Sequence, residues 1–347
     1  MATEKRVTAR SRLVTELAHE ILSREESVAF PISSEHELSA RFNLSRVTVR
    51  LALSDLESRG LIYRRQGKGT FAHGRSSRPT KTIAVLLKSQ PNQEHWPIAE
   101  MVRGIQKALS GQRISMLTVS TSPKEWSCEM MQGLSGVIVF PFGITQEDLD
   151  DLNYRKLPFI LAEETSTLSG PKISLGQEQA AYKITEDLLS RGHRQIALLT
   201  GFEPSLDEVK RRGVHRAMSE ASVDPSEVPE VSADFNKDGG LEAVISILNL
   251  QPRPTAVIAF DDGLAALLCA KARQSMNLAV PRDISITSFH DSPYLRYLEP
   301  KLTTVRFDFF GAGSAAALTL SNTALTGEKI EDVCLEPVYC AGATVSD

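Results

Sequence analysis

The sequence predicts an α/β protein in two parts: a small head of three helices and a two-stranded wing, then a two-lobed body of parallel α/β sheets. Three observations lead to this prediction. Residues 10–73 contain short helical patterns followed by two short strands around a basic turn. From residue 82 onward, short apolar runs alternate with amphipathic stretches, as in parallel sheets covered by helices. This alternation runs over more than 250 residues, which is longer than a single sheet usually accommodates, so two lobes are expected.

The first two helices of the head are marked by apolar spacing and by a cap. Residues 12–22 carry apolar side chains at helical spacing. Ser33 or Ser34 is expected to cap a second helix, and Glu37 is placed to complete a capping box on Ser34. Asn43 is expected to form the turn that follows this helix.

The third helix and the wing complete the head. Ser45 is expected to cap the helix, and Gly60 is expected to end it. Residues 61–63 and 70–71 read as short strands around the turn formed by residues 64–69. Three helices and a wing make a winged helix-turn-helix, which is expected to occupy residues 1–73. Residues 74–81 are polar, contain Gly and Pro, and are expected to form a linker.

The body, residues 82–347, is predicted to alternate strands with helices. The expected strands are residues 83–87, 114–119, 136–140, 159–161, 195–200, 256–260, 285–289 and 303–307. The expected helices are residues 98–109, 145–152, 177–191, 206–221, 239–249, 262–276 and 311–325. Ligands of such folds bind beyond the carboxyl ends of the strands.

Charge is distributed unevenly between the two parts. The formal net charge is −4. Residues 1–80 contain 14 Lys and Arg against 9 Asp and Glu, whereas the remainder contains 25 basic and 34 acidic residues. A basic head on an acidic body fits a DNA-binding unit attached to a part that does not touch DNA.

The cysteines and the apolar runs exclude several classes of protein. Cys128, Cys269, Cys334 and Cys340 are scattered and form no CxxC pair, so neither structural zinc nor a disulfide framework is expected. No apolar run approaches the roughly 20 residues that span a bilayer, and the N-terminus is polar where a signal peptide needs an apolar core. We therefore expect a cytoplasmic protein with reduced thiols, no metal ligands and no cofactor.

The start of the third helix carries side chains suited to DNA. Free N–H groups and the positive dipole end of a helix face phosphates well, and Arg side chains reach phosphate or guanine. We expect Arg46 to contact a base edge, Ser45 and Thr48 to contact phosphate, and Arg50 to contact either. His36 is either a weaker DNA contact or a plain surface residue.

The wing offers a second contact with the duplex. Gly67 and Gly69 would let the backbone approach the minor groove, and Lys68 would add a phosphate contact. Arg64 and Gln66 complete the candidate set at this turn. The alternative interpretation is an ordinary Gly-rich hairpin turn.

One glycine-rich stretch resembles a dinucleotide-binding fingerprint. Residues 311–316 fit the loose GxGxx[GA] pattern after a strand and before a helix. The stretch lies too near the C-terminus to begin a dinucleotide-binding half, so no NAD site is expected.

The head resembles the GntR-family winged helix. The match runs over nearly all of residues 10–73. It rests on residues 34–38 (SEHEL), 45–50 (SRVTVR), 52–53 (AL), Leu56, 60–62 (GLI) and 66–71 (QGKGTF). This resemblance implies DNA binding through the third helix and the wing. His36 departs from the family pattern, which usually has a phosphate-binding Arg at this place.

The body resembles the effector-binding part of the LacI/GalR repressors, which is itself similar to periplasmic sugar-binding proteins. The matching segments follow the family order: residues 192–199 (GHRQIALL), 254–259 (PTAVIA), 280–285 (VPRDIS) and 300–305 (PKLTTV). Certain bacterial sugar-responsive repressors, including arabinose-responsive ones, combine these two parts. They are dimers that release their operator when a small molecule binds between the lobes.

The positions that hold sugar hydroxyls in that family differ here. The chain has Lys210 where the family usually has Arg, Asp261 where it has Asn, His290 where it has Asp, and Glu163 where an Asp is frequent. Asp261 also follows a predicted strand directly, and the alternative role for the Asp261-Asp262 pair is helix capping, which we expect of Asp262 in any case.

Two aromatic residues complete the expected effector site. Phe235 could stack on the apolar face of a sugar. Trp96 follows the first strand of the body and would either line the cleft or anchor a loop.

The sequence is therefore interpreted as a bacterial transcription regulator of the repressor type. We expect it to bind a two-fold operator as a homodimer and to respond to a small polar ligand, a sugar or a sugar derivative. The alternative is a solute-binding or sensor protein in which ligand binding is the main activity. An enzyme is not expected, because the His residues are dispersed and no HExxH or GxSxG motif is present.

Overall fold

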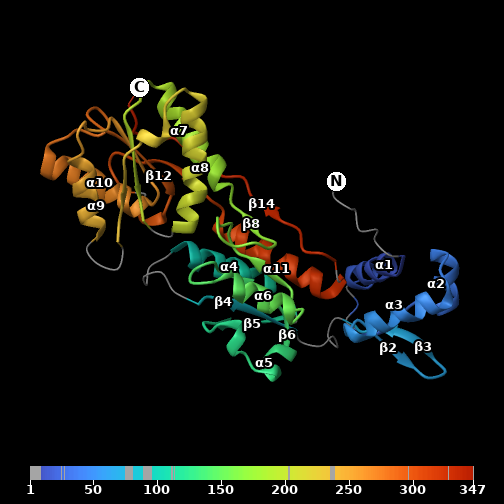
Figure 1. The fold of residues 1–347 in the computed structure, drawn as a ribbon. Helices are drawn as coiled ribbons and strands as arrows, with labels where there is room; N and C mark the ends of the chain where they lie inside the picture. Colours follow the sequence, from blue (N-terminus) through green and yellow to red (C-terminus); the bar gives the residue numbers. More distant parts are fainter. Residues whose placement is uncertain are drawn as a thin grey trace.

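The computed structural model describes residues 9–24, 26, 28–74, 81–88, 96–110, 112, 114–201, 204–234, 239–295, 297–326 and 328–346. The head lies at one end of an elongated molecule, with one body lobe beside it and the other lobe beyond (Figure 1). Among the described residues, no helix combines the length and the apolar character needed to cross a membrane.

The head is a winged helix-turn-helix, as predicted. Its helices are α1 (Ala9–Ser23), α2 (Glu35–Phe42) and α3 (Arg46–Ser58), and its strands are β1 (Phe30–Pro31), β2 (Ile62–Arg65) and β3 (Gly69–Ala72). The strands form an antiparallel sheet in the order β1-β3-β2, so β1 extends the predicted two-stranded wing. Apolar side chains from all three helices and the sheet form a separate core, which includes Leu13, Leu38, Leu53 and Ile62.

The local signals of the head are confirmed. Ser34, and not Ser33, caps α2, and Glu37 closes the capping box. Asn43 ends α2 in the left-handed conformation with a φ of 51°. Gly60 follows α3 with a φ of 67°, a conformation that a residue with a Cβ adopts only with strain.

The lobe nearer the head is built on a parallel sheet in the order β5-β4-β6-β7. The strands are β4 (Lys81–Leu86), β5 (Ile114–Val119), β6 (Leu134–Val139) and β7 (Phe159–Leu161). The helices are α4 (Trp96–Leu109), α5 (Cys128–Gln132), α6 (Gln146–Tyr154), α11 (Phe309–Thr326) and the short η2 (Pro123–Glu125). Side chains of α4 and α11 pack on one face of the sheet, and side chains of α6 pack on the other.

The second lobe has a six-stranded sheet in the order β10-β9-β11-β12-β13-β15, parallel except for β15. The strands are β9 (Ile196–Thr200), β10 (Glu230–Ser232), β11 (Ala256–Ala259), β12 (Ser285–His290), β13 (Thr303–Arg306) and β15 (Val338–Cys340). The helices are α7 (Gln177–Ser190), α8 (Pro204–Glu220), α9 (Gly239–Leu248), α10 (Asp262–Met276) and the short η3 (Pro225–Glu227) and η4 (Pro293–Leu295). Helices α7 and α8 cover one face, and α9 and α10 cover the other.

The chain passes between the lobes after β7, after β13 and after α11. Two short strands lie on these passages, β8 (Ile173–Ser174) and β14 (Val333–Cys334), and they pair in parallel between the lobes (Figure 1). Because each lobe contains segments from both halves of the body sequence, neither lobe is a continuous stretch of chain.

The glycines of residues 311–316 lie inside α11, because the helix begins at Phe309, before the glycines. A Cβ on Gly313 would lie 1.9 Å from the carbonyl oxygen of Met101, and a Cβ on Gly104 would lie 2.0 Å from that of Phe310. Both glycines therefore serve the close crossing of α4 and α11, which accounts for the resemblance to a dinucleotide-binding pattern without any nucleotide.

The predicted strands and helices of the body are present, with ends shifted by up to two residues. The predicted linker extends too far, because Lys81 already belongs to β4; residues 75–80 lie outside the described part. The sequence did not predict α5, β8, β10, β14 or β15, which are between two and five residues long.

Candidate functional site

The N-terminus of α3 is an exposed, capped helix end. The Ser45 side chain accepts a hydrogen bond from the backbone N–H of Thr48 at 3.2 Å, and the two hydroxyl oxygens lie 2.9 Å apart. Val49, Leu53 and Leu56 turn inward and are buried, so the helix presents the opposite face to solvent. This confirms the predicted cap and places the first turn of α3 at the surface.

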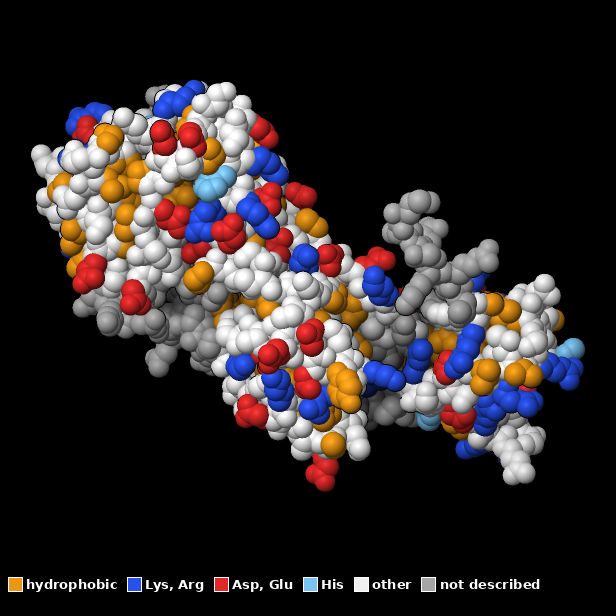
Figure 2. All heavy atoms as spheres, viewed as in Figure 1, with side chains coloured by type: hydrophobic (Ala, Val, Ile, Leu, Met, Phe, Trp, Pro, Cys, Tyr) orange, Lys and Arg blue, Asp and Glu red, His pale blue; other side chains and the backbone are white. Residues whose placement is uncertain are grey.

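Arginine side chains surround this helix end. Arg46 is exposed, and its Nη2 lies 3.5 Å from Nδ1 of His36 on α2. Arg50 forms an ion pair with Glu35 at 3.2 Å, and Arg64 of the wing lies 3.8 Å from the same carboxylate. Figure 2 shows Lys and Arg side chains gathered on the head, at the right of the view. Glu35 thus holds Arg50 beside α3, and Arg64 lies between Glu35 and Glu57 of α3, whose carboxylate is 3.4 Å away.

The wing tip is an exposed turn with room around its backbone. Gly67 and Gly69 have φ values of 72° and 103°, and no atom lies within 4 Å of where their Cβ atoms would be. Gln66 and Lys68 are exposed beside them. Any side chain at these two glycine positions would be strained by the backbone alone.

Two apolar side chains on α3 were missed by the sequence analysis. Val47 is 67% exposed and Leu51 is 46% exposed, and they lie one helical turn apart on the outward face. Their spacing of four residues from each other, out of phase with Val49 and Leu53, was the available signal. Large exposed apolar side chains beside Arg46 suit contact with a thymine methyl group.

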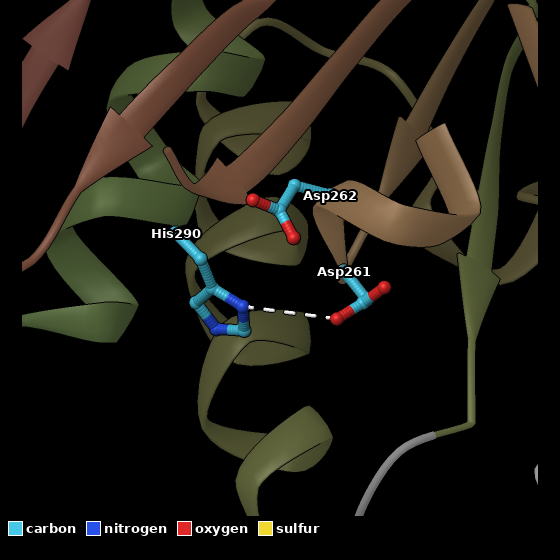
Figure 3. A group of neighbouring side chains, drawn as sticks. All are labelled: Asp261, Asp262 and His290. Carbon is cyan, nitrogen blue, oxygen red and sulfur yellow. Dashed lines mark ion pairs between the residues drawn. The ribbon is translucent and has the colours of Figure 1, made fainter. Parts of the chain in front are cut away.

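Polar side chains of the second lobe gather at the carboxyl ends of β11 and β12. Asp261 caps α10, since its Oδ1 accepts the backbone N–H of Leu264 at 3.0 Å. The expectation that Asp262 is the cap was wrong by one residue: Asp262 is the first residue of the helix, and its Oδ2 accepts the N–H of Ser292 at 2.6 Å. Nδ1 of His290 lies 3.9 Å from Oδ2 of Asp261, and all three side chains point toward one another (Figure 3).

Burial raises the pKa of both neighbouring carboxyl groups. The pKa of Asp261 is raised by burial, and the pKa of Asp262 is raised to about 7 by burial and by the charge of Asp261. His290 is 7% exposed and has a φ of 95°, which is rare for a residue other than glycine.

Lys210 supplies the positive charge of this cluster. It lies in α8, is 2% exposed, and its Nζ is 3.9 Å from Oδ1 of Asp207 and 5.6 Å from the ring centres of Phe260 and Phe289. Its charge opposes the increase in the pKa of Asp261. Asp207 was missed by the sequence analysis, because nothing in its local pattern shows that α8 is turned inward here.

Glu163 faces the cluster from the first lobe. It follows β7, is 8% exposed, and accepts a hydrogen bond on Oε1 from Nε2 of Gln177 at the start of α7. Burial raises the pKa of Glu163 to about 7, and the charge of Lys210 opposes the increase. The structure therefore brings Glu163, Lys210, Asp261 and His290 into one group across the two lobes.

An aromatic cluster connects Trp96 to this group. The ring centre of Trp96 lies 5.3 Å from that of Phe309, and the ring centre of Phe309 lies 5.7 Å from that of His290. Phe307 also lies 5.9 Å from His290. Trp96 is therefore near the candidate site, but with Phe309 between it and His290. Phe235, the other predicted aromatic residue, lies outside the described residues.

Comparison with known families covers both parts of the chain. Residues 9–72 match the family described as bacterial regulatory proteins, gntR family, and residues 185–341 match the periplasmic binding protein-like domain. The head and most of the body thus match the two families that the sequence resembles.

Relatives extend the match over nearly the whole chain. An arabinose metabolism transcriptional repressor of Geobacillus stearothermophilus is 32% identical over 362 residues, covering 96% of each chain. Catabolite control protein A of Priestia megaterium is 27% identical over 310 residues, covering 86% of this chain and 90% of that protein. The structure of a LacI family transcriptional regulator from Enterococcus faecium with bound ribose aligns with a TM-score of 0.66 at 23% identity, covering 77% of this chain and 99% of that chain.

Proposed function

The chain belongs to the transcriptional repressors that join a GntR-type head to a periplasmic binding protein-like body, and we propose that it represses genes by binding a two-fold operator as a homodimer. We further propose that a sugar or sugar derivative between the lobes releases the DNA. The observation that carries the first proposal is the exposed, capped N-terminus of α3 between basic side chains and the wing. Binding to DNA places the protein in the cytoplasm of its cell.

Each DNA-facing residue has a proposed role. Arg46 would read a base edge, because it is exposed at the first position of α3 and no ion pair ties it to a carboxylate among the described residues. Ser45 and Thr48 would bind phosphate beside the helix N-terminus. Val47 would contact a thymine methyl group.

Supporting contacts are proposed for the remaining basic residues. Arg50 and Arg64 would contact the DNA backbone once they exchange their carboxylate partners, Glu35 and Glu57, for phosphate. His36 would orient Arg46. Lys68 would bind phosphate while Gly67 and Gly69 let the wing approach the groove, with Gln66 beside them.

The effector is proposed to bind where the two lobes meet. Glu163 from one lobe and Lys210, Asp261 and His290 from the other offer both hydrogen-bond donors and acceptors, as adjacent sugar hydroxyls require. A ligand that contacts both lobes stabilises one lobe arrangement over another. A coupling of roughly 1–3 kcal/mol would change operator affinity about 5- to 150-fold.

DNA recognition can be tested with operators selected from a random DNA pool and measured by fluorescence anisotropy. We expect a steep loss of affinity with salt, since each neutralised phosphate releases counterions. Arg46→Ala should cost roughly 1–3 kcal/mol and relax the preference at one position of each half-site. Arg41→Ala is the matched control, because Arg41 is an exposed arginine of the same head that pairs with Glu20.

The outcome for Arg46→Ala separates two roles. Equal losses on selected and random DNA would show that Arg46 binds phosphate and not a base. Full affinity for both selected and random DNA would contradict the proposal that α3 reads the bases.

Effector release can be tested by adding arabinose or ribose, the sugars named for relatives, to the protein–operator complex. We expect one of these sugars or a close derivative to lower operator affinity, and the same sugar to raise the melting temperature of the protein. A sugar that raises the melting temperature but leaves operator affinity unchanged would contradict release by that sugar. Sedimentation of the complex should give two chains per operator, and one chain would contradict the dimer.

A further inference from the structure

We propose that Asp261, Asp262 and His290 bind a divalent transition-metal ion. One ligand atom from each residue lies within 4.8 Å of those of the other two. The three side chains come from two elements, the N-terminus of α10 and the end of β12, and lie side by side (Figure 3). Asp262 is 5% and His290 is 7% exposed, and Asp261 is half-buried beside them.

Both carboxylates accept backbone N–H groups, and one oxygen of Asp261 is also turned toward His290. Oδ1 of Asp261 accepts the N–H of Leu264, and its Oδ2 lies 3.9 Å from Nδ1 of His290. Oδ2 of Asp262 accepts the N–H of Ser292, and the backbone N–H groups of Asp262 and Gly263 also act on this carboxylate. Capping of α10 therefore explains one oxygen of Asp261 but not why a second carboxylate and an imidazole meet it.

A further buried carboxylate, Asp207 of α8, acts on this group through its charge. Asp207 is 2% exposed, and its Oδ1 accepts no hydrogen bond from the described residues but lies 3.9 Å from Nζ of Lys210. The charge of Asp207 raises the pKa of Asp261, and the charge of Lys210 opposes the increase in the pKa of Asp207, Asp261 and Glu163. Burial disfavours the charged form of these carboxyl groups, so a divalent cation would bind by displacing their protons.

The donor set indicates the class of metal. Calcium and magnesium prefer ligand sets made of oxygen, whereas an imidazole with two carboxylates suits manganese, iron, cobalt, nickel or zinc. Metal–ligand bonds of about 2.0–2.2 Å need the three ligand atoms to approach one another further, which rotation of the side chains can provide. Open coordination positions would remain for hydroxyl oxygens of a ligand.

The consequence for regulation rests on the proposed function, whereas ion binding itself does not. If the effector binds between the lobes, the ion would lie in the effector site and hold adjacent hydroxyls of the sugar. Sugar binding would then require the metal, and chelation would leave the protein on its operator.

The test uses the full, untagged chain, stripped with EDTA and dialysed, and titrated with Mn²⁺ by calorimetry. Loss of the electron paramagnetic resonance signal of aqueous Mn²⁺ gives an independent binding curve. We expect one ion per chain, and we expect Asp262→Asn and His290→Gln each to weaken binding at least tenfold. Asp283→Asn is the matched control, because Oδ2 of Asp283 also accepts a backbone N–H, from Ala279 at 2.7 Å, in the same lobe.

Three outcomes would overturn the proposal. Mn²⁺ and Co²⁺ should each saturate the site, so non-saturating titrations with both ions would refute it. An equal loss of Mn²⁺ affinity in Asp283→Asn would show that the ion is held by general attraction to negative charge and not by this site. Saturable binding of glucosamine with no ion binding would assign the carboxylates to an amine instead. If Asp262→Asn fails to fold by circular dichroism, His290→Gln decides.

Failure of the ion and failure of the proposed function are distinguishable. Operator affinity of the metal-free chain is measured separately by anisotropy. Intact operator binding with no ion binding rejects only the metal site, whereas ion binding without operator binding rejects only the repressor function.

Discussion

Replacing Glu163 by Gln should make the stability of the protein less dependent on pH. The pKa of Glu163 is raised from 4.5 to about 7 in the folded protein, chiefly by burial. A carboxyl group with a raised folded pKa stabilises the fold fully below its unfolded pKa. That contribution is lost as the pH rises through the folded pKa, here between about pH 4.5 and 7.

The size of the effect follows from the two pKa values. At about 1.4 kcal/mol per unit, the contribution lost across this range is of the order of 3 kcal/mol. In Glu163→Gln the amide oxygen can still accept the hydrogen bond from Gln177, so the packing between β7 and α7 is preserved. The variant should therefore equal or exceed the wild type in stability at pH 8, and lose this advantage toward pH 5.

Urea unfolding followed by circular dichroism between pH 5 and 8 measures the difference. Glu164→Gln is the control, because the neighbouring Glu164 is only half-buried and its carboxylate oxygens accept hydrogen bonds from Ser174 and the N–H of Gln177. Parallel curves of unfolding free energy against pH for the wild type and Glu163→Gln would refute the reasoning, since Glu163 would then titrate alike in both states.

The other predictions concern the head, the site and the helix crossing. Lys68→Ala should weaken binding to all DNA sequences alike and flatten the salt slope by about one in anisotropy titrations; a change in sequence preference would contradict a phosphate contact. Asp261→Asn keeps an N-cap, whereas Asp261→Ala loses about 0.5–2 kcal/mol of stability in urea unfolding; equal stabilities would contradict the cap. Gly313→Ala should lower the free energy of unfolding by about 1–3 kcal/mol and lower the melting temperature. Gly133→Ala, whose Cβ would have room, should change neither. An unchanged melting temperature in Gly313→Ala would contradict the close crossing of α4 and α11.

The head could be predicted from sequence because its signals are local. Ser34, Ser45 and Gly60 each act within a few residues of their own position, and the structure uses them as predicted. The pair of very short strands β8 and β14 could not be predicted, since each is only two residues long and their pairing joins segments about 160 positions apart in the chain.

The candidate effector group was only partly predictable. Asp261 was accessible because it follows a predicted strand, and His290 because it stands where the related family has Asp. The choice between Asp261 and Asp262 as the cap is a one-residue question that two adjacent Asp residues leave open. Asp207 and Phe309 carry no local signal at all. Their relation to Lys210 and His290 is created by the packing of α8 and by the return of the chain into α11.

Helix α11 contacts both the candidate effector group and the head. It begins at Phe309, whose ring lies against His290 and Trp96, and its far end lies beside α1 of the head (Figure 1). Its 18 residues form one continuous helix about 27 Å long. A tilt of α11 imposed at Phe309 would move its C-terminal end relative to α1 of the head, with the glycine contact to α4 as the pivot. A change at the ligand site would then reach the head through this helix and not only through the connecting chain.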